Sequence, residues 1–164
     1  MSLALGVCVL TAVAGSAHAA IVPYECHMNG AQVVGPVATP AIGVAFLTFN
    51  TTTSELSIAS AVYQDLLGPS VNVSLQGPAL PNQNGGAFFF FTLDNPGATS
   101  GSFSGSTVLT GPQVTALENG MLYILLRSQV FTGGEIRGHV LQVPAPGAAA
   151  LLGLAALAGA RRRR

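Results

Sequence analysis

The stretch TGGEIRGHV, Thr132–Val140, carries the pattern that decides the fold. Its pair Gly133–Gly134 predicts a turn, because glycine lacks a Cβ and reaches backbone dihedrals that other residues avoid. The residues after the pair are typical of a strand. Gly138 inside that strand predicts the close approach of a neighbouring strand, or a bulge. We therefore interpret the stretch as a turn followed by a strand.

The charged residues of this stretch make it the first candidate for a chemical site. Side chains two positions apart on a strand share a face, so Glu135 and Arg137 are expected to form an ion pair, with Ile136 pointing into the core. His139 is four residues from Glu135. We interpret Gly133, Gly134, Glu135, Arg137 and Gly138 as a structural signature and not as catalytic residues.

The remainder of the body consists of short apolar or alternating runs separated by turn residues. The runs that predict strands are Ile42–Asn50, Glu55–Gln64, Val71–Gln76, Ala87–Leu93, Gly101–Gly105, Met121–Ser128 and Gly134–Val143. Thr110–Gly120 predicts a short helix near 111–119, with Thr110 and Gln113 spaced as a capping box. About eight strands and one short helix predict an all-β fold, an antiparallel β-sandwich. The pattern alone does not choose between Greek-key, immunoglobulin-like and barrel closures.

The run Ala87–Leu93 is continuously apolar, which favours a strand with both faces covered. The alternative is an open sheet face, which would expose two of the rings in Phe88–Phe91 as a patch for sugar or protein.

Charge is scarce and unevenly distributed. The chain has six acidic residues and six basic ones, and four of the basic residues are the terminal arginines. The body therefore holds two arginines and no lysine against six carboxylates, a formal charge of −4. Nucleic-acid binding requires clustered cations, so we expect no nucleic-acid partner.

The N-terminal residues 1–19 predict a secretory signal peptide. Leu3–Val13 is apolar, and Ala17–Ala19 supplies a small-x-small cleavage pattern. A buried N-terminal helix is the alternative. Cleavage after Ala19 would leave Cys26 as the lone cysteine, which we expect to be a buried small residue rather than an intermolecular thiol.

The C-terminal residues 143–164 predict a sorting or anchor segment. An apolar helix over 145–160 would span ~24 Å, short of the ~30 Å hydrocarbon core. The segment resembles the PEP-CTERM sorting signal through Val143, Pro144 and Pro146, with Ala145 where that motif has Glu, and through its terminal arginines Arg161, Arg162, Arg163 and Arg164. The resemblance implies a bacterial, exported protein whose partners include an exosortase-type sorting enzyme, the export machinery and, before processing, the membrane. An ordinary C-terminal anchor is the alternative.

The body, residues 20–142, resembles the CHRD domain over Asn29–Asn50, Ser74–Ala79 and Leu109–Val140. The most specific parts are Leu122–Tyr123 and Gly133–Gly138. The resemblance implies an all-β, immunoglobulin-like fold without an established activity. Family members commonly carry His-x-His in the middle segment and a further His after the Leu-Tyr strand, a set suited to zinc or copper. This chain has Ser74, Gln76 and Arg127 at those positions.

No catalytic, cofactor-binding or metal-ligating residues are predicted. Cys26 and His27 are adjacent and point to opposite faces of a strand, and Phe103 stands where a nucleophile elbow needs serine, so we expect Phe103 to point inward. We expect a non-enzymatic exported module of the envelope or matrix, acting by adhesion, display, or binding of protein or polysaccharide. The alternatives are a metal-dependent enzyme, superoxide-dismutase-like or hydrolytic, which the three replaced histidines disfavour, and a binder of one protein ligand by analogy with chordin.

Overall fold

The structure, a computed structural model, describes residues 20–144. The predicted signal peptide at 1–19, the predicted apolar helix at 145–160 and the arginines at 161–164 lie outside the described residues. Within 20–144, no helix is long and apolar enough to cross a membrane.

Ten strands, one α-helix and one short 3₁₀ helix form the described part of the chain. The strands are β1 (Ile21–Asn29), β2 (Ile42–Asn50), β3 (Glu55–Gln64), β4 (Ser70–Gln76), β5 (Ala87–Leu93), β6 (Gly101–Ser104), β7 (Ser106–Val108), β8 (Tyr123–Ser128), β9 (Ile136–His139) and β10 (Leu141–Gln142). The helices are η1 (Gly30–Gln32) and α1 (Gly111–Glu118). The predicted helix is confirmed, and its capping-box pair is joined by Thr110 N–H donating to Gln113 Oε1 at 2.9 Å.

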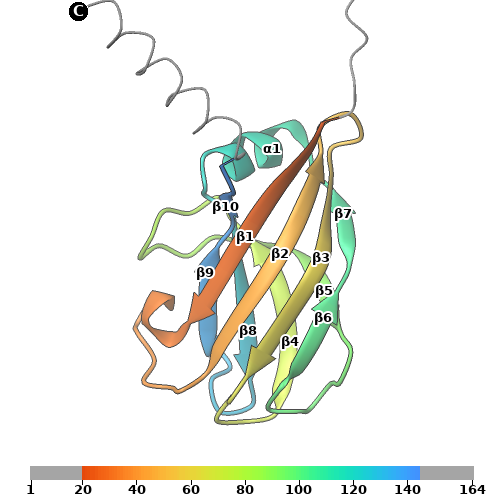
Figure 1. Cartoon of the computed structure of the whole chain (residues 1–164). Helices are drawn as coiled ribbons and strands as arrows, with labels where there is room; N and C mark the ends of the chain where they lie inside the picture. The colour runs from red at the N-terminus through yellow and green to blue at the C-terminus, as the bar shows by residue number, and fades with distance from the viewer. Residues whose placement is uncertain (1–19, 145–164) are drawn as a thin grey trace, which may run out of the picture.

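The sheet closes on itself into a barrel (Figure 1). β1 pairs with β2 on one side and, through Asn29 opposite Arg137, with β9 on the other. The order around the ring is β1-β2-β3-β6-β5-β4-β8-β9, and all pairs are antiparallel. The predicted immunoglobulin-like sandwich is therefore wrong. A sandwich and a barrel both give each strand one inward face, so the alternation of side chains is the same in the two folds.

Close contact at Gly138 allows β9 to complete the ring. A Cβ at this position would lie 2.4 Å from the carbonyl oxygen of His27 and 2.8 Å from Cys26 Sγ, both in β1. The Cys26 thiol donates to the Gly138 carbonyl at 3.2 Å. The predicted close approach at Gly138 is confirmed, and so is the burial of Cys26. That burial raises the pKa of the Cys26 thiol to about 12, so the thiol stays protonated.

The inward side chains of the barrel form one core, and α1 lies across one end of it (Figure 1). Phe103 is buried there as predicted. The prediction that both faces of β5 are covered is wrong. Phe91 is buried and Phe89 is half-buried, whereas Phe90 is 57% exposed. A register shift in the pairing of β4 with β5 also lets Phe88 pack against the core, so the open face of β5 carries one ring instead of two.

Candidate functional site

Glu135 and Arg137 are both buried, but they do not form the predicted ion pair. In the described part of the chain, no carboxylate oxygen lies within 4.0 Å of an Arg137 nitrogen. β9 begins at Ile136, and Glu135 N–H donates to the Leu126 carbonyl at 2.8 Å, so Glu135 precedes the regular strand. Residues two apart share a face only within a regular strand, which is why the prediction failed. Ile136 is fully buried, as predicted.

Glu135 instead ties two connections to the start of β9. Its Oε1 accepts from Thr39 Oγ1 and from the backbone N–H of Leu67, each at 2.7 Å. Thr39 belongs to the connection between β1 and β2, and Leu67 to that between β3 and β4. The Glu135 carboxylate therefore has a structural role, because it holds three segments distant in sequence at one point.

The predicted glycine turn precedes Glu135. Gly134 N–H donates to the Phe131 carbonyl at 3.1 Å, and Gly134 has φ of +133°, a region that favours glycine. A Cβ on Gly134 would also lie 2.6 Å from a methyl carbon of Leu125, whereas one on Gly133 would meet nothing within 4 Å. The turn prediction is confirmed, and Gly134 is the residue that requires it.

Arg137 reaches away from Glu135 and stacks on Tyr123. Its Cζ lies 3.7 Å from the centroid of the Tyr123 ring, and its NH2 lies 3.2 Å from Nε2 of His139. The other imidazole nitrogen, Nδ1, lies 2.9 Å from the Gly120 carbonyl. A carbonyl only accepts, so Nδ1 carries the hydrogen and Nε2 accepts from Arg137. The geometry thus assigns a neutral His139.

Burial shifts the pKa values of His139 and Arg137. Burial lowers the pKa of His139, and the positive charge of Arg137 lowers it further, while the hydrogen bond to Gly120 acts in the opposite direction. Burial also lowers the pKa of Arg137. Nε and NH1 of Arg137 have no hydrogen-bond partner among residues 20–144. Within these residues, Arg137 is therefore a buried cation with two unpaired donor groups.

The three positions where the resemblance implies histidines lie together on the outer face of β4 and β8. β4 carries Ser74 and Gln76, and β8 pairs with it so that Arg127 is opposite Asn72. Arg127 NH1 donates to Asn72 Oδ1 at 3.2 Å and to Ser74 Oγ at 3.4 Å. The sequence did not indicate Asn72 as a member of this group.

The Gln76 amide completes the network. Its hydrogen-bonding neighbours place the amide oxygen toward Arg127 NH2 at 3.1 Å and Ser74 Oγ at 2.7 Å. The amide nitrogen then donates to Tyr123 Oη at 2.8 Å and to the Gly85 carbonyl at 3.2 Å. A hydroxyl, an amide and a guanidinium thus satisfy one another where the family commonly has imidazoles.

Metal-ligating residue types do not gather elsewhere in residues 20–144: no three His, Cys, Asp or Glu side chains lie close enough to hold a metal ion. Cys26 is buried and the side chain of His27 is 67% exposed, so these neighbours point to opposite faces as predicted.

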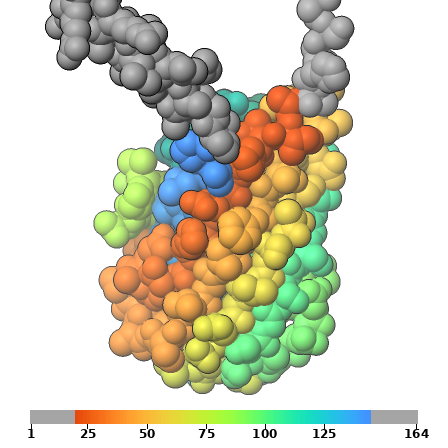
Figure 2. Space-filling view, in the orientation of Figure 1, coloured from red at the N-terminus to blue at the C-terminus, as the bar shows by residue number. Residues whose placement is uncertain are grey.

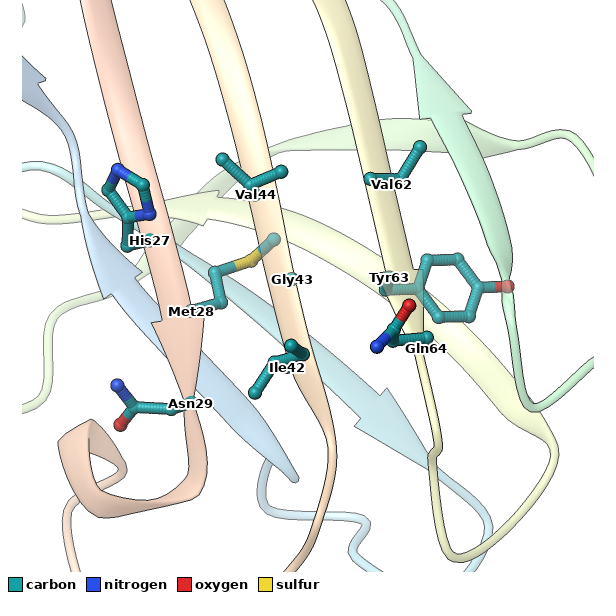
Figure 3. A pocket seen from close by; sticks show the side chains of 9 residues that line it. All are labelled: His27, Met28, Asn29, Ile42, Gly43, Val44, Val62, Tyr63 and Gln64. Atoms are coloured by element: carbon teal, nitrogen blue, oxygen red, sulfur yellow. The ribbon is translucent and has the colours of Figure 1, made fainter.

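Two surface grooves, each of about 350 Å³, lie on the barrel. The first crosses the outer face of β1, β2 and β3, the face seen in Figure 2, and Figure 3 shows its lining side chains. Its walls are largely apolar, with Ile42 and Val62 each 50% exposed. We call it the β1–β3 groove.

The second groove lies between η1, the connection 77–86 and the end of β9. It is lined by Ala31, Gln32, Pro81, Asn82, Gly120, His139 and Leu141, and we call it the His139 groove. The connection 77–86 stands out beside β9 in Figures 1 and 2. Sequence patterns did not indicate Gln32 or Asn82, because only the fold brings η1 and this connection together.

One comparison with known proteins identifies a relationship. The family model of the CHRD domain matches residues 24–140. No curated protein and no solved structure matches the chain. The match extends from within β1 to the residue after β9 and includes both parts of the signature, with Tyr123 and Arg137.

Proposed function

The chain belongs to the CHRD domain family, and from this premise we propose that it is a non-enzymatic, exported β-barrel module that acts by binding at the cell envelope or in the extracellular matrix. Adhesion, display, and capture of a protein or polysaccharide are the forms that this role takes. A β-rich domain with a rigid closed sheet is consistent with a binding module, because its connections are held in place by the barrel.

The network of Arg127, Ser74 and Gln76 is the observation that carries the proposal. Arg127 donates to both other residues, at 3.4 Å and 3.1 Å, and the Gln76 amide is turned to accept from it. A guanidinium has no lone pair for a metal, and its positive charge disfavours a second cation beside it. This supports a binding role over the alternative of a metal-dependent enzyme.

The terminal sequences supply the proposed location. Residues 1–19 have the features of a signal peptide, and residues 143–164 resemble a sorting signal with its terminal arginines. We propose that the export machinery moves the body across the membrane, and that an exosortase-type enzyme removes the tail. Before that cleavage, the C-terminal segment would hold the protein at the membrane.

Intact-mass measurement of the protein from the envelope and medium of its native cells tests the location. We expect the mass of a chain that has lost residues 1–19 and the C-terminal arginines. Full-length protein in the cytosol would contradict the proposal.

Metal analysis of the same purified protein tests the non-enzymatic role. After dialysis against a chelator, we expect less than one zinc or copper ion per chain. A full equivalent of either metal, lost when Ser74 or Gln76 is replaced by Ala, would favour the metalloenzyme instead.

A further inference from the structure

The His139 groove has the size and the polar groups of a small-molecule site. Its volume of about 350 Å³ falls within the range of ~300–1,000 Å³ that such sites span. The Gln32 and Asn82 side chains place two primary amides on it, and Leu141, which is 53% exposed, adds an apolar surface. Amides both donate and accept, which suits a ligand with hydroxyl or amino groups.

In the described part of the chain, a buried cation with two unpaired donor groups lies behind this groove. Arg137 is 1% exposed, its NH2 donates to the His139 that lines the groove, and its Nε and NH1 have no partner among residues 20–144. Buried polar groups are nearly always hydrogen-bonded, and a buried charge is costly without an opposite charge. The two free donors therefore indicate a missing acceptor, and an anionic acceptor would also balance the charge.

The β1–β3 groove provides the contrast. It has about the same volume and also carries two primary amides, those of Asn29 and Gln64, but no arginine contributes to its lining (Figure 3). Of the two grooves, only the His139 groove is lined by a side chain that the Arg137 guanidinium hydrogen-bonds.

We propose that the His139 groove binds a small carboxylate-bearing ligand, of the size of one sugar acid or one amino acid. The carboxylate accepts from the free donors of Arg137, and Gln32 and Asn82 bind the polar remainder of the ligand. A guanidinium matches a carboxylate with two parallel hydrogen bonds. The described body carries six carboxylates and two arginines, so a monoanion is favoured over a multiply charged phosphate.

A ligand can reach Arg137 only if η1, which packs against β9, moves. η1 packs against β9, and its Gln32 side chain donates to the His27 carbonyl at 2.8 Å in an exposed position. An exposed hydrogen bond is readily exchanged for one with water. Loss of this bond would let η1 move away from β9, which would open the Arg137 guanidinium to the groove and free the Gln32 amide for the ligand.

This inference gives a ligand class to the proposed binding role and so rests on it. The test is isothermal titration of the full chain, in mild detergent, with galacturonate and with glutamate. Galactose and glutaminamide are the matched compounds that lack a carboxylate, and phosphate is the competing anion. The expected result is binding of at least one of the two carboxylates, with no binding of its counterpart without a carboxylate. The two carboxylates distinguish a sugar acid from an amino acid.

Variants locate the site. Ala31→Trp fills the groove from an exposed position, and Asn82→Ala removes a groove amide. Each should weaken carboxylate binding by about tenfold, Ala31→Trp because the indole occupies the groove and Asn82→Ala because a hydrogen bond to the ligand is lost. Arg137→Lys keeps the charge but loses the two parallel N–H donors of the guanidinium, and should weaken binding similarly. Val62→Ala in the β1–β3 groove is the control and should bind as the wild type does.

Equal binding of galactose and galacturonate would overturn the proposal, as would preference for phosphate, wild-type affinity in both Ala31→Trp and Asn82→Ala, or absence of binding by both carboxylates. If the protein is exported and metal-free but binds neither carboxylate, the proposed site is wrong and the proposed function is not affected. If a bound carboxylate is converted to product, the proposed site is supported and the non-enzymatic role is wrong.

Discussion

Arg137 Cζ lies 3.7 Å from the ring centroid of Tyr123. The two residues are fourteen positions apart in the chain and belong to the neighbouring strands β9 and β8. They also belong to the two most specific parts of the CHRD resemblance, Leu122–Tyr123 and Gly133–Gly138. The signature is therefore a physical contact on the outer face of the barrel.

This stacking predicts that Arg137→Ala lowers the stability of the fold. The change removes the cation–π contact, the hydrogen bond to His139 and the packing of the alkyl chain, at a cost of about 2–3 kcal/mol. Arg137→Met keeps most of the packing and removes a buried charge, so its loss should be smaller. Urea unfolding measures both, and a free energy of unfolding unchanged in Arg137→Ala would contradict the prediction.

Glu135 should matter through its two partners and not through Arg137. Glu135→Ala removes two hydrogen bonds from a charged acceptor and leaves the Leu67 N–H unpaired, so we expect a loss of about 3 kcal/mol. Glu135→Gln keeps an acceptor oxygen at the same place and should lose less. In a double-mutant cycle with Thr39→Val, Glu135→Ala should show coupling. In a cycle with Arg137→Met, Glu135→Ala should show little coupling energy. Strong coupling between these two variants would mean that Glu135 and Arg137 do form an ion pair.

The strands were largely predictable from the sequence, and their closure was not. Leu47 and Phe49 point inward because their run alternates, and that signal is local. In β3 a register shift between Ile58 and Ser60 interrupts the alternation, so Leu56 and Tyr63 are both buried although they are seven residues apart. The pairing of β1 with β9 depends on two segments about a hundred residues apart, and β1 contains Pro23, a residue that weakens a strand pattern. Gly138 was the local sign of a close approach, but it did not indicate which strand approaches.

The candidate site was less predictable than the fold. Ser74 and Gln76 share a face of one strand by their spacing alone, but their contact with Arg127 follows from the pairing of β4 with β8. Glu135 and Arg137 illustrate the opposite failure, since the spacing was correct and the strand begins one residue too late for it to apply. Gln32 and Asn82 reach their groove from connections, whose paths carry no periodic signal.

Closure of the barrel predicts a large effect of Gly138→Ala. The new Cβ would lie 2.4 Å from the backbone oxygen of His27, an atom that cannot move without displacing β1. We expect a loss of about 2 kcal/mol or more. Gly133→Ala in the same stretch meets nothing within 4 Å and is the matched control. Similar urea midpoints for the two variants would mean that β9 does not approach β1 this closely.

The neutral His139 predicts a loss of stability in acid. Burial lowers the pKa of the folded imidazole below its ordinary value of 6.5, so the unfolded chain takes up the proton first as the pH falls. The contribution of His139 is full above about pH 6.5 and is lost as the pH drops through the folded pKa. The wild type should therefore lose more stability between about pH 7 and pH 5 than His139→Gln, which does not titrate there.

Thermal melting over that range measures the difference. His27→Gln is the control, because the side chain of His27 is 67% exposed. If His139→Gln loses as much as the wild type, His139 is not held neutral by its burial and by Arg137.

The network of Arg127, Ser74 and Gln76 predicts that three histidines at these positions would bind zinc. Arg127 already reaches both other residues, within 3.4 Å of Ser74 Oγ and 3.1 Å of Gln76 Oε1, so side chains from the three positions converge. Three imidazoles are a sufficient protein ligand set for zinc, with a fourth position left to water. The variant Ser74→His/Gln76→His/Arg127→His should retain about one zinc per chain after dialysis against a weak chelator, while Arg127→His alone should retain little. If the triple variant folds, as judged by its melting transition, and retains no zinc, the three positions do not form a metal-binding geometry. If instead the wild type retains zinc at this network, the guanidinium does not displace a metal, and the metalloenzyme alternative becomes the better account of the protein.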